Sequence, residues 1–380
     1  MKKAYNLNWI KNAEIQSRAT YWLSRNLIGQ TQLKSAKTAF PDHFYRPNFF
    51  VKAGLFLFVL IACTFFLGLI SLFLQNIVTN LNFTVLSLLC AVFSIFFLEF
   101  HIKSMRLYHS GVDNALLYVS IALAAVPVFL EFNDLKVWQY ALVLSVILII
   151  ATVRYADLLT AAGSFIALFV ALANFLVNFS TGITLLPFSV MLLAACIYFP
   201  VSKNKSLYYA NCCKLIQILS LITFYLGGNY LMVREGNALL SNPAASISEQ
   251  IPFALVLYLF TIVIPLAYIW MGISKKDRIS LNTGLLAITF SLYTFAHYFS
   301  PFTEPQEIFL SGLCLILCSA LLIRYLHTPK HGFSDEPEER NIPEELKSNL
   351  IAQALGQDPE TKGIEFGGGN FGGGGAGEVY

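Results

Sequence analysis

Two carboxylates stand within or beside long apolar runs, where a charged group is costly and therefore marks a candidate functional site. Glu99 precedes Lys103 by four residues, and Asp157 follows Arg154 by three. Both spacings place the two charges on one face of a helix, so we expect each pair to form a local salt bridge. The alternative is that Glu99 and Asp157 carry protons or cations across a membrane.

Other polar residues in the apolar runs have simpler expected roles. Lys214 begins a run, so its long side chain can reach the lipid headgroups. His297, Asn174 and Asn178 are expected near the same end of two spans and can form one polar cluster. An ordinary hydrogen bond between helices is the favoured explanation of such a cluster, and a transport site is the alternative.

Motifs that would indicate an enzyme or a bound metal do not occur in this sequence. There is no His-Glu-x-x-His zinc motif, no Gly-x-Ser-x-Gly nucleophile elbow, and no Gly-x-Gly-x-x-Gly that follows a strand. Cys314 and Cys318 share a helix face, but no histidine lies nearby in the sequence. We therefore expect no catalytic residue, no metal and no cofactor.

The elements that must position these side chains are membrane-spanning helices. Residues of the AVILMFWYC set make up 56% of the 380 residues and charged residues only 12%, whereas soluble domains are about a quarter charged. We predict an all-α transmembrane bundle of ten spans over residues 51–326, with nine or eleven spans as alternatives. The predicted spans are 53–74, 81–100, 114–131, 137–153, 156–178, 181–199, 209–231, 251–273, 280–299 and 306–326.

The distribution of basic residues predicts the orientation of the bundle. With both termini in the cytoplasm, 23 of the 25 Lys and Arg residues fall on the cytoplasmic side, and only Lys136 and Arg234 fall outside. Cytoplasmic segments of membrane proteins carry this excess of positive charge. We therefore expect both ends of the chain to lie in the cytoplasm.

Residues 1–50 are expected to form a cytoplasmic amphipathic helical hairpin. Gly29 is predicted to end the first helix, Thr31 to cap the second, and Pro41 to end it. The favoured interpretation is a basic hairpin that lies on anionic lipid headgroups or on the bundle. The alternative is a partner-binding hairpin that uses Trp22.

Residues 327–380 are expected to form an acidic cytoplasmic tail. It contains ten acidic residues and four basic ones, whereas residues 1–52 contain nine basic and two acidic residues, so the two ends can attract each other. We predict one short helix near 342–355 and a disordered glycine-rich end. That end is favoured as a passive tether, and the alternative is a docking tag made of Phe366, Phe371 and Tyr380.

The front of the chain resembles that of uncharacterised bacterial polytopic membrane protein families. The resemblance is carried by Trp22-Leu-Ser-Arg-Asn-Leu-Ile28, by Gln32-Leu33, and by Tyr45-Arg-Pro47 just before the first span. It implies a short cytoplasmic helical hairpin joined to many hydrophobic helices in the cytoplasmic membrane of a bacterium, and these families offer no catalytic residues to carry over.

The leading functional hypothesis is a non-enzymatic membrane scaffold or accessory protein, because intramembrane charge is sparse and the distinctive residues lie in the two ends. The alternative is a secondary transporter that divides into five plus five spans and uses Glu99 and Asp157. A membrane-embedded enzyme ranks third. The expected partners are the lipid bilayer and an unidentified protein at the tail, and no nucleic acid.

Overall fold

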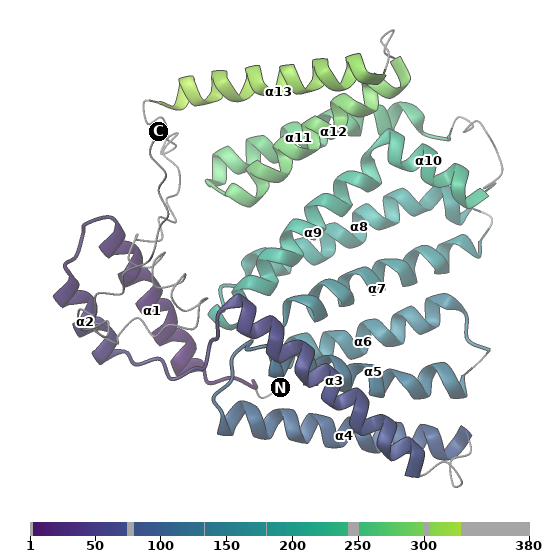
Figure 1. Ribbon diagram of the computed structural model, residues 1–380. Helices are drawn as coiled ribbons and strands as arrows, with labels where there is room; N and C mark the ends of the chain where they lie inside the picture. The colour runs from purple at the N-terminus through teal and green to yellow at the C-terminus, as the bar shows by residue number, and fades with distance from the viewer. Residues whose placement is uncertain are drawn as a thin grey trace, which may run out of the picture.

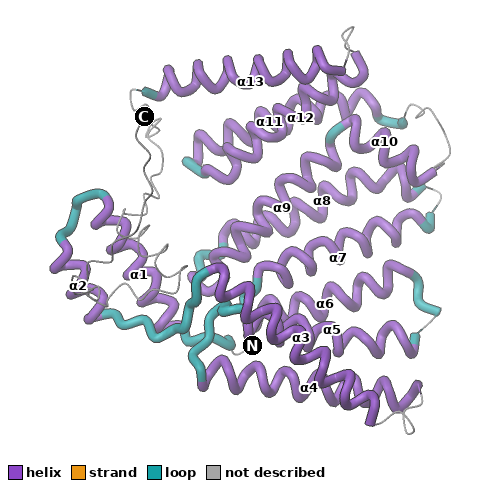
Figure 2. The backbone as a smooth tube through the Cα atoms, viewed as in Figure 1, coloured by secondary structure: helices purple, strands orange, loops and turns teal. Residues whose placement is uncertain are grey.

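The computed structural model describes residues 3–73, 80–132, 134–179, 181–241, 251–299 and 304–327. Helices and their connections make up these ranges, and Figure 2 draws no strand among them. The helices are α1 (Leu7–Ser24), α2 (Gln30–Ala39), α3 (Phe49–Phe73), α4 (Asn80–Ser104), α5 (Val112–Glu131), α6 (Val137–Tyr155), α7 (Leu158–Val177), α8 (Gly182–Lys203), α9 (Ala210–Gly228), α10 (Tyr230–Ser241), α11 (Ala254–Lys275), α12 (Arg278–Phe299) and α13 (Glu304–Leu326), with a 3₁₀ turn η1 (Leu207–Tyr209) before α9.

Ten of these helices are long and apolar enough to cross a bilayer, namely α3 to α9 and α11 to α13. The prediction of an all-α, multi-pass transmembrane chain is therefore confirmed. The seventh span ends earlier than predicted, because α9 stops at Gly228 and the chain continues as the separate helix α10. The predicted tail helix near 342–355 lies outside the described residues, as do Phe366, Phe371 and Tyr380.

Eight of the spans form four antiparallel hairpins, which are α4 with α5, α6 with α7, α8 with α9, and α11 with α12 (Figure 1). The α6–α7 hairpin turns through only Ala156 and Asp157. Small residues let its helices approach closely, since a Cβ atom at Gly163 would lie 3.2 Å from Leu148 Cδ1. The helix α3 crosses the α4–α5 hairpin and α13 lies against α12 (Figure 1), and few of the side chains of α3 and α13 are buried.

The short connections of the four hairpins lie at the end of the bundle where α1 and α2 lie, and we name this the α1/α2 end (Figure 1). At this end α3 crosses the start of α5. Gly111 permits the crossing, because its φ is +100° and a Cβ atom there would lie 2.3 Å from the carbonyl oxygen of Lys52.

The N-terminal segment forms the helices α1 and α2, which pack against each other, but two of the predicted caps are wrong. Arg25, rather than Gly29, caps the C-terminus of α1. Gly29 is instead the N-cap of α2, where its N–H donates to Gln32 Oε1 at 2.8 Å, and Thr31 lies inside the helix. The prediction failed because a glycine suits both a helix end and a helix start, and the chain between Arg25 and Gly29 is a longer turn than expected.

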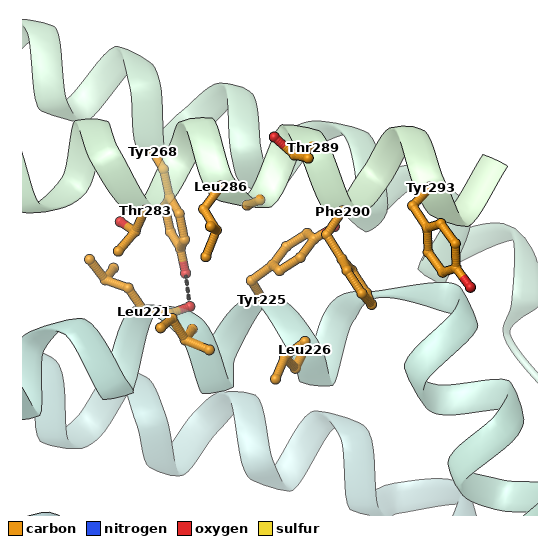
Figure 3. A pocket seen from close by; sticks show the side chains of 11 residues that line it. Leu221, Tyr225, Leu226, Tyr268, Thr283, Leu286, Thr289, Phe290 and Tyr293 are labelled. Carbon is orange, nitrogen blue, oxygen red and sulfur yellow. Dashed lines mark hydrogen bonds between the residues drawn. The ribbon is translucent and has the colours of Figure 1, made fainter. Parts of the chain in front are cut away.

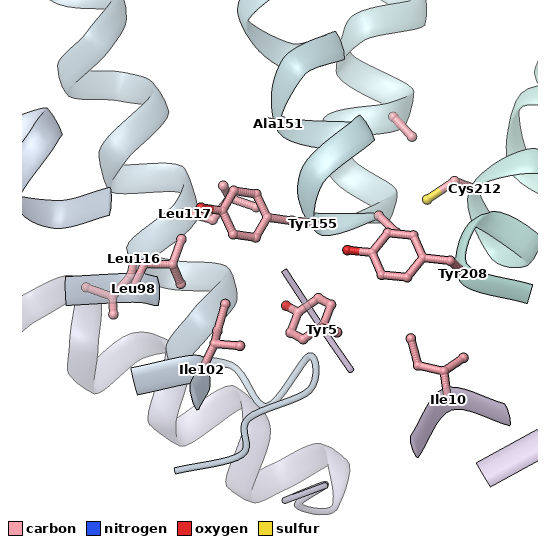
Figure 4. Packing of buried hydrophobic residues seen from close by; sticks show 12 residues of the cluster. Tyr5, Ile10, Leu98, Ile102, Leu116, Leu117, Ala151, Tyr155, Tyr208 and Cys212 are labelled. Atoms are coloured by element: carbon pink, nitrogen blue, oxygen red, sulfur yellow. The ribbon is translucent and has the colours of Figure 1, made fainter. Parts of the chain in front are cut away.

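A buried apolar cluster lies at the α1/α2 end and contains residues of α1, α4, α5, α6, α7 and α9. Figure 4 shows Tyr5 in it, placed among Ile102, Tyr208 and Ile10. Tyr5, close to the first described residue, is therefore part of the packed core at this end of the bundle.

Candidate functional site

Two aspartates are buried at the α1/α2 end, and we name the polar residues around them the aspartate cluster. It consists of Tyr5, His109, Ser110, Asp113, Asn114, Tyr118, Asp157 and Thr160. Asp113 is 1% exposed and Asp157 is 3% exposed. The cluster joins the connection between α4 and α5 to the connection between α6 and α7, and it adds the first described residues of the chain.

Asp113 lies in the first turn of α5 and accepts four hydrogen bonds. Its Oδ1 accepts from the backbone N–H of Ser110 at 2.8 Å and from the Ser110 hydroxyl at 3.0 Å. Its Oδ2 accepts from the backbone N–H of His109 at 2.8 Å and from the Tyr5 hydroxyl at 2.7 Å. Such bonds to a charged acceptor are the strong ones, so Asp113 fixes both its own loop and Tyr5.

Asp157 is the N-cap residue of α7. Its Oδ2 accepts from the backbone N–H of Thr160 at 3.0 Å, and its Oδ1 accepts from Asn114 Nδ2 at 2.7 Å. The Tyr118 hydroxyl lies 3.1 Å and 3.0 Å from the two carboxylate oxygens. Asp157 is thus bound to α5, and the predicted Arg154–Asp157 salt bridge is wrong. The cause is the turn at Ala156, whose φ of 49° ends α6 before Asp157 can share a helix face with Arg154.

Arg154 pairs with Glu99 instead, and this pair replaces both predicted local salt bridges. Arg154 Nε lies 2.7 Å from Glu99 Oε1, and the Tyr155 hydroxyl donates to the same oxygen at 2.8 Å. Glu99 therefore connects α4 to α6, whereas Lys103 is exposed and makes no ion pair with Glu99. The spacing of charges along one helix shows which of them share a face. It does not show which neighbouring helix packs against that face.

The N-terminal segment is held in place by contacts on both sides of the cluster. The backbone N–H of Ala4 donates to the carbonyl oxygen of Arg154 at 3.1 Å. Tyr208, from the connection between α8 and α9, donates to the same carbonyl oxygen. Lys3 Nζ lies 4.8 Å from the centre of the Tyr208 ring. Residues 3–5 therefore contact three of the four hairpins, each at or next to its connection.

Burial raises the pKa of the Tyr5 phenol well above 10.0, and the negative charge of Asp113 raises it further. The phenol consequently stays protonated, as its role of hydrogen-bond donor requires. Burial also lowers the pKa of His109 below 6.5, although Asp113 and Asp157 oppose that shift. His109 is therefore neutral at pH 7.

Among the described residues, no Lys, Arg or His side chain forms a salt bridge with Asp113 or Asp157. The amide oxygen of Asn114 is buried and has no hydrogen-bond partner, although its nitrogen donates to Asp157. The cluster thus has two chemical capacities. It can hold the N-terminal segment through Tyr5, and the buried amide oxygen of Asn114 can accept a hydrogen bond from a further donor.

The other predicted site residues lie apart from this cluster. Lys214 is exposed near the start of α9, as expected, and Trp22 is 46% exposed on α1. The polar cluster predicted from Asn174, Asn178 and His297 does not form. Asn174 donates to Val170 of its own helix α7, and Asn178 donates to Asn174.

His297 lies on α12 beside Tyr298, with ring centres 4.9 Å apart. Figure 1 places α8 and α9 between α7 and α12, so the asparagines of α7 and His297 belong to separate parts of the bundle. Hydropathy placed the three residues at a similar depth but gave no information about which spans are neighbours.

A second polar group, which the sequence analysis missed, lies where α9 ends. Asn229 is fully buried and donates to the Tyr225 hydroxyl at 2.9 Å and to the Thr294 hydroxyl at 3.0 Å. The backbone N–H of Tyr230 donates to the Thr261 hydroxyl at 3.0 Å. These bonds satisfy the polar groups that the helix break exposes, so the group explains the interruption between α9 and α10.

Beside this group an apolar pocket of about 310 Å³ opens between α9, α11 and α12 (Figure 3). Figure 3 shows Tyr225 and Phe290 across the pocket, and the Tyr268 hydroxyl donates to the Leu221 carbonyl oxygen at 2.9 Å. The lining carries no charged side chain. This pocket therefore offers shape and apolar surface but no acid or base.

The sequence held one readable signal for the aspartate cluster. Asp157 is followed three residues later by Thr160, and Asp277 by Ser280, which is a helix N-cap pattern. Both aspartates follow a residue with left-handed backbone, Ala156 and Lys276, and both cap the second helix of a hairpin. No comparable signal identified Tyr5 or Asp113.

Within the described ranges, no group of three or more His, Cys, Asp or Glu side chains is placed to hold a metal ion. No protein-family model, no curated protein and no solved structure matches the chain.

Proposed function

We propose that this protein is a membrane scaffold that anchors a basic helical hairpin at one surface of the bilayer and presents it to another protein. The observation that carries the proposal is the 2.7 Å hydrogen bond from Tyr5 to the buried Asp113. It fastens the segment before α1 to the core of the bundle, so α1 and α2 have a defined position.

Exposed apolar side chains near the turn of the hairpin support the same proposal. Tyr21, Trp22 and Leu27 are 42%, 46% and 69% exposed, and they lie near the turn between α1 and α2. Aromatic side chains of this kind are enriched in protein interfaces. Lys11 and Arg18 are exposed on the same helix, which favours a partner with acidic groups.

The orientation of the protein in the membrane is part of the proposal. We place the α1/α2 end on the cytoplasmic side, because 23 of the 25 Lys and Arg residues then fall on that side. The resemblance of the front of the chain to bacterial membrane protein families supports the cytoplasmic membrane of a bacterium as its location. The acidic tail beyond α13 would share the cytoplasmic side, and its negative charge makes it an intramolecular candidate for a charge contact with the hairpin.

Photo-crosslinking in intact cells tests the scaffold function. A photoreactive amino acid replaces Trp22, and the matched control carries it at Lys205, which is exposed in the connection between α8 and α9 at the same end. We expect a discrete adduct from position 22 only, and we expect Tyr5→Ala to weaken it. Identical adducts from both positions would contradict the proposal.

Secondary transport is the second candidate, because Asp113 and Asp157 are buried and no described cationic side chain forms a salt bridge with either one. A carboxylate in that setting can bind and release a proton during transport. Reconstituted vesicles with an internal pH-sensitive dye distinguish the two functions. Proton flux that Asp157→Asn abolishes would favour transport, and no flux above empty vesicles would favour the scaffold.

A further inference from the structure

A pocket of about 520 Å³ lies at the α1/α2 end between α4 and α6, outside the aspartate cluster. It is lined by Phe96, Glu99, Phe100, Lys103, Ser104 and Arg154. Its charged lining consists of two cations and one carboxylate, so its formal net charge is positive. The ends of two membrane spans, Phe83–Ser104 and Val137–Tyr155, set its depth at the level of the headgroups.

The arrangement of charge in this pocket favours an anion. Glu99 accepts from Arg154 Nε at 2.7 Å and from the Tyr155 hydroxyl at 2.8 Å, so the carboxylate is engaged on the side of α6. Lys103 lies one helical turn beyond Glu99 and is exposed, with no ion pair in the described part of the chain. Its ammonium group can therefore meet an incoming negative charge.

The apolar part of the lining indicates what kind of molecule carries that charge. Phe96 and Phe100 lie one turn apart on α4 and are 70% and 56% exposed. Phe93, one turn deeper, is 59% exposed and extends this face toward the middle of the span. A charged opening at headgroup level that continues into an exposed aromatic face matches a phospholipid, with its phosphate above and its acyl chain below.

We propose that this pocket binds one anionic phospholipid, whose phosphate lies between Lys103 and Arg154 while an acyl chain covers Phe96 and Phe100. The Ser104 hydroxyl is in reach of the same headgroup as a donor. A free phosphate ion would use the polar residues only, and it would leave both phenylalanines without a partner. The inference is independent of the scaffold function, because it uses the guanidinium side chain of Arg154, whereas the N-terminal segment contacts the backbone carbonyl oxygen of that residue.

Lipid binding to the full-length protein in detergent tests the site. Native mass spectrometry measures the affinity for dioleoyl phosphatidylglycerol and for dioleoyl phosphatidylcholine, which has the same chains but no net charge. We expect phosphatidylglycerol to bind more tightly, and Lys103→Ala to weaken it about fivefold, the effect of one lost lysine near an anionic headgroup. Lys214→Ala removes an exposed lysine at the same end that does not line this pocket, so it is the matched control and should weaken binding less than Lys103→Ala.

A second pair of variants separates a lipid from a free anion. Phe96→Ala with Phe100→Ala should weaken phosphatidylglycerol binding, whereas millimolar inorganic phosphate should not displace the lipid. Equal affinity for the two lipids, or equal effects of Lys103→Ala and Lys214→Ala, would overturn the site. Displacement by inorganic phosphate, with no effect of the phenylalanine variants, would show a plain anion site and would overturn the lipid assignment.

Discussion

Tyr5 donates a hydrogen bond of 2.7 Å to Asp113, a residue 108 positions away in the sequence. The bond connects the segment before the first helix to the first turn of α5, in the interior of the α1/α2 end. Both side chains are almost completely buried, with exposures of 5% and 1%. The position of the cytoplasmic hairpin in our proposal depends on this contact.

Tyr5→Phe removes the hydroxyl and keeps the ring, so it tests the bond alone. We expect the free energy of unfolding to fall by about 2 kcal/mol. The reason is that the bond goes to a buried charged acceptor, which keeps its other donors. Hydrogen exchange of α1 should become faster, as measured by mass spectrometry. Tyr21→Phe is the control, since Tyr21 is 42% exposed and its change should leave exchange as it is. Equal exchange in the two variants would remove the anchoring role of Tyr5.

Asp157→Ala should destabilise the bundle much more than Asp277→Ala. Both variants lose an N-cap, which costs about 1 kcal/mol. Asp157→Ala also leaves Asn114 and Tyr118 without their acceptor, which adds about 1–3 kcal/mol for each buried group. Unfolding by titration with a denaturing detergent measures both. A similar loss for the two variants would mean that Asp157 acts as a cap only.

The pH dependence of stability should show the neutral state of His109. Because burial lowers its pKa below 6.5, the unfolded chain takes up this proton before the folded chain does as the pH falls. The contribution of neutral His109 to the free energy of unfolding is therefore fully present above about pH 6.5 and is lost progressively below that pH. His109→Asn removes the titration and tolerates the left-handed backbone of this position, where φ is 47°. The variant should lose less stability between pH 7 and pH 5, and a parallel decline in both proteins would contradict the assignment.

Reporter fusions test the number of spans and the proposed orientation. A reporter active only outside the cytoplasmic membrane should work when fused after Asn237 in α10, and it should fail when fused after Lys330, beyond α13. The physical reason is that seven spans precede the first site and ten precede the second. The reverse pattern would contradict the orientation, and activity at both sites would contradict the span count.

The sequence predicted those features that depend on local composition. Ten apolar runs of sufficient length predicted ten spans, and the periodicity of residues 1–50 predicted the helical hairpin. Capping was less predictable, because the same glycine can end one helix or begin the next. Gly29 is such a case, and only the length of the turn after Arg25 decided it.

The site was less predictable than the spans, because its contacts join distant parts of the chain. Glu99 pairs with Arg154, 55 residues away, rather than with Lys103 on its own helix. Asp157 was identified as a candidate, but its partners on α5 were not, since hydropathy does not specify which spans are neighbours. Asp113 was missed because it lies in the first turn of a span, where an acidic residue is common and does not by itself indicate a site.

The most direct test of the anchored hairpin is a distance measurement between α1 and the bundle. Spin labels are attached through unnatural amino acids at Ser17 on α1 and at Lys205 in the connection between α8 and α9, both of which are exposed. Pulsed electron paramagnetic resonance then measures their distance distribution in the native chain and in Tyr5→Ala. The account predicts one narrow distribution for the native chain and a broad one for the variant. A broad distribution in the native chain, or the same narrow distribution in both, would contradict it.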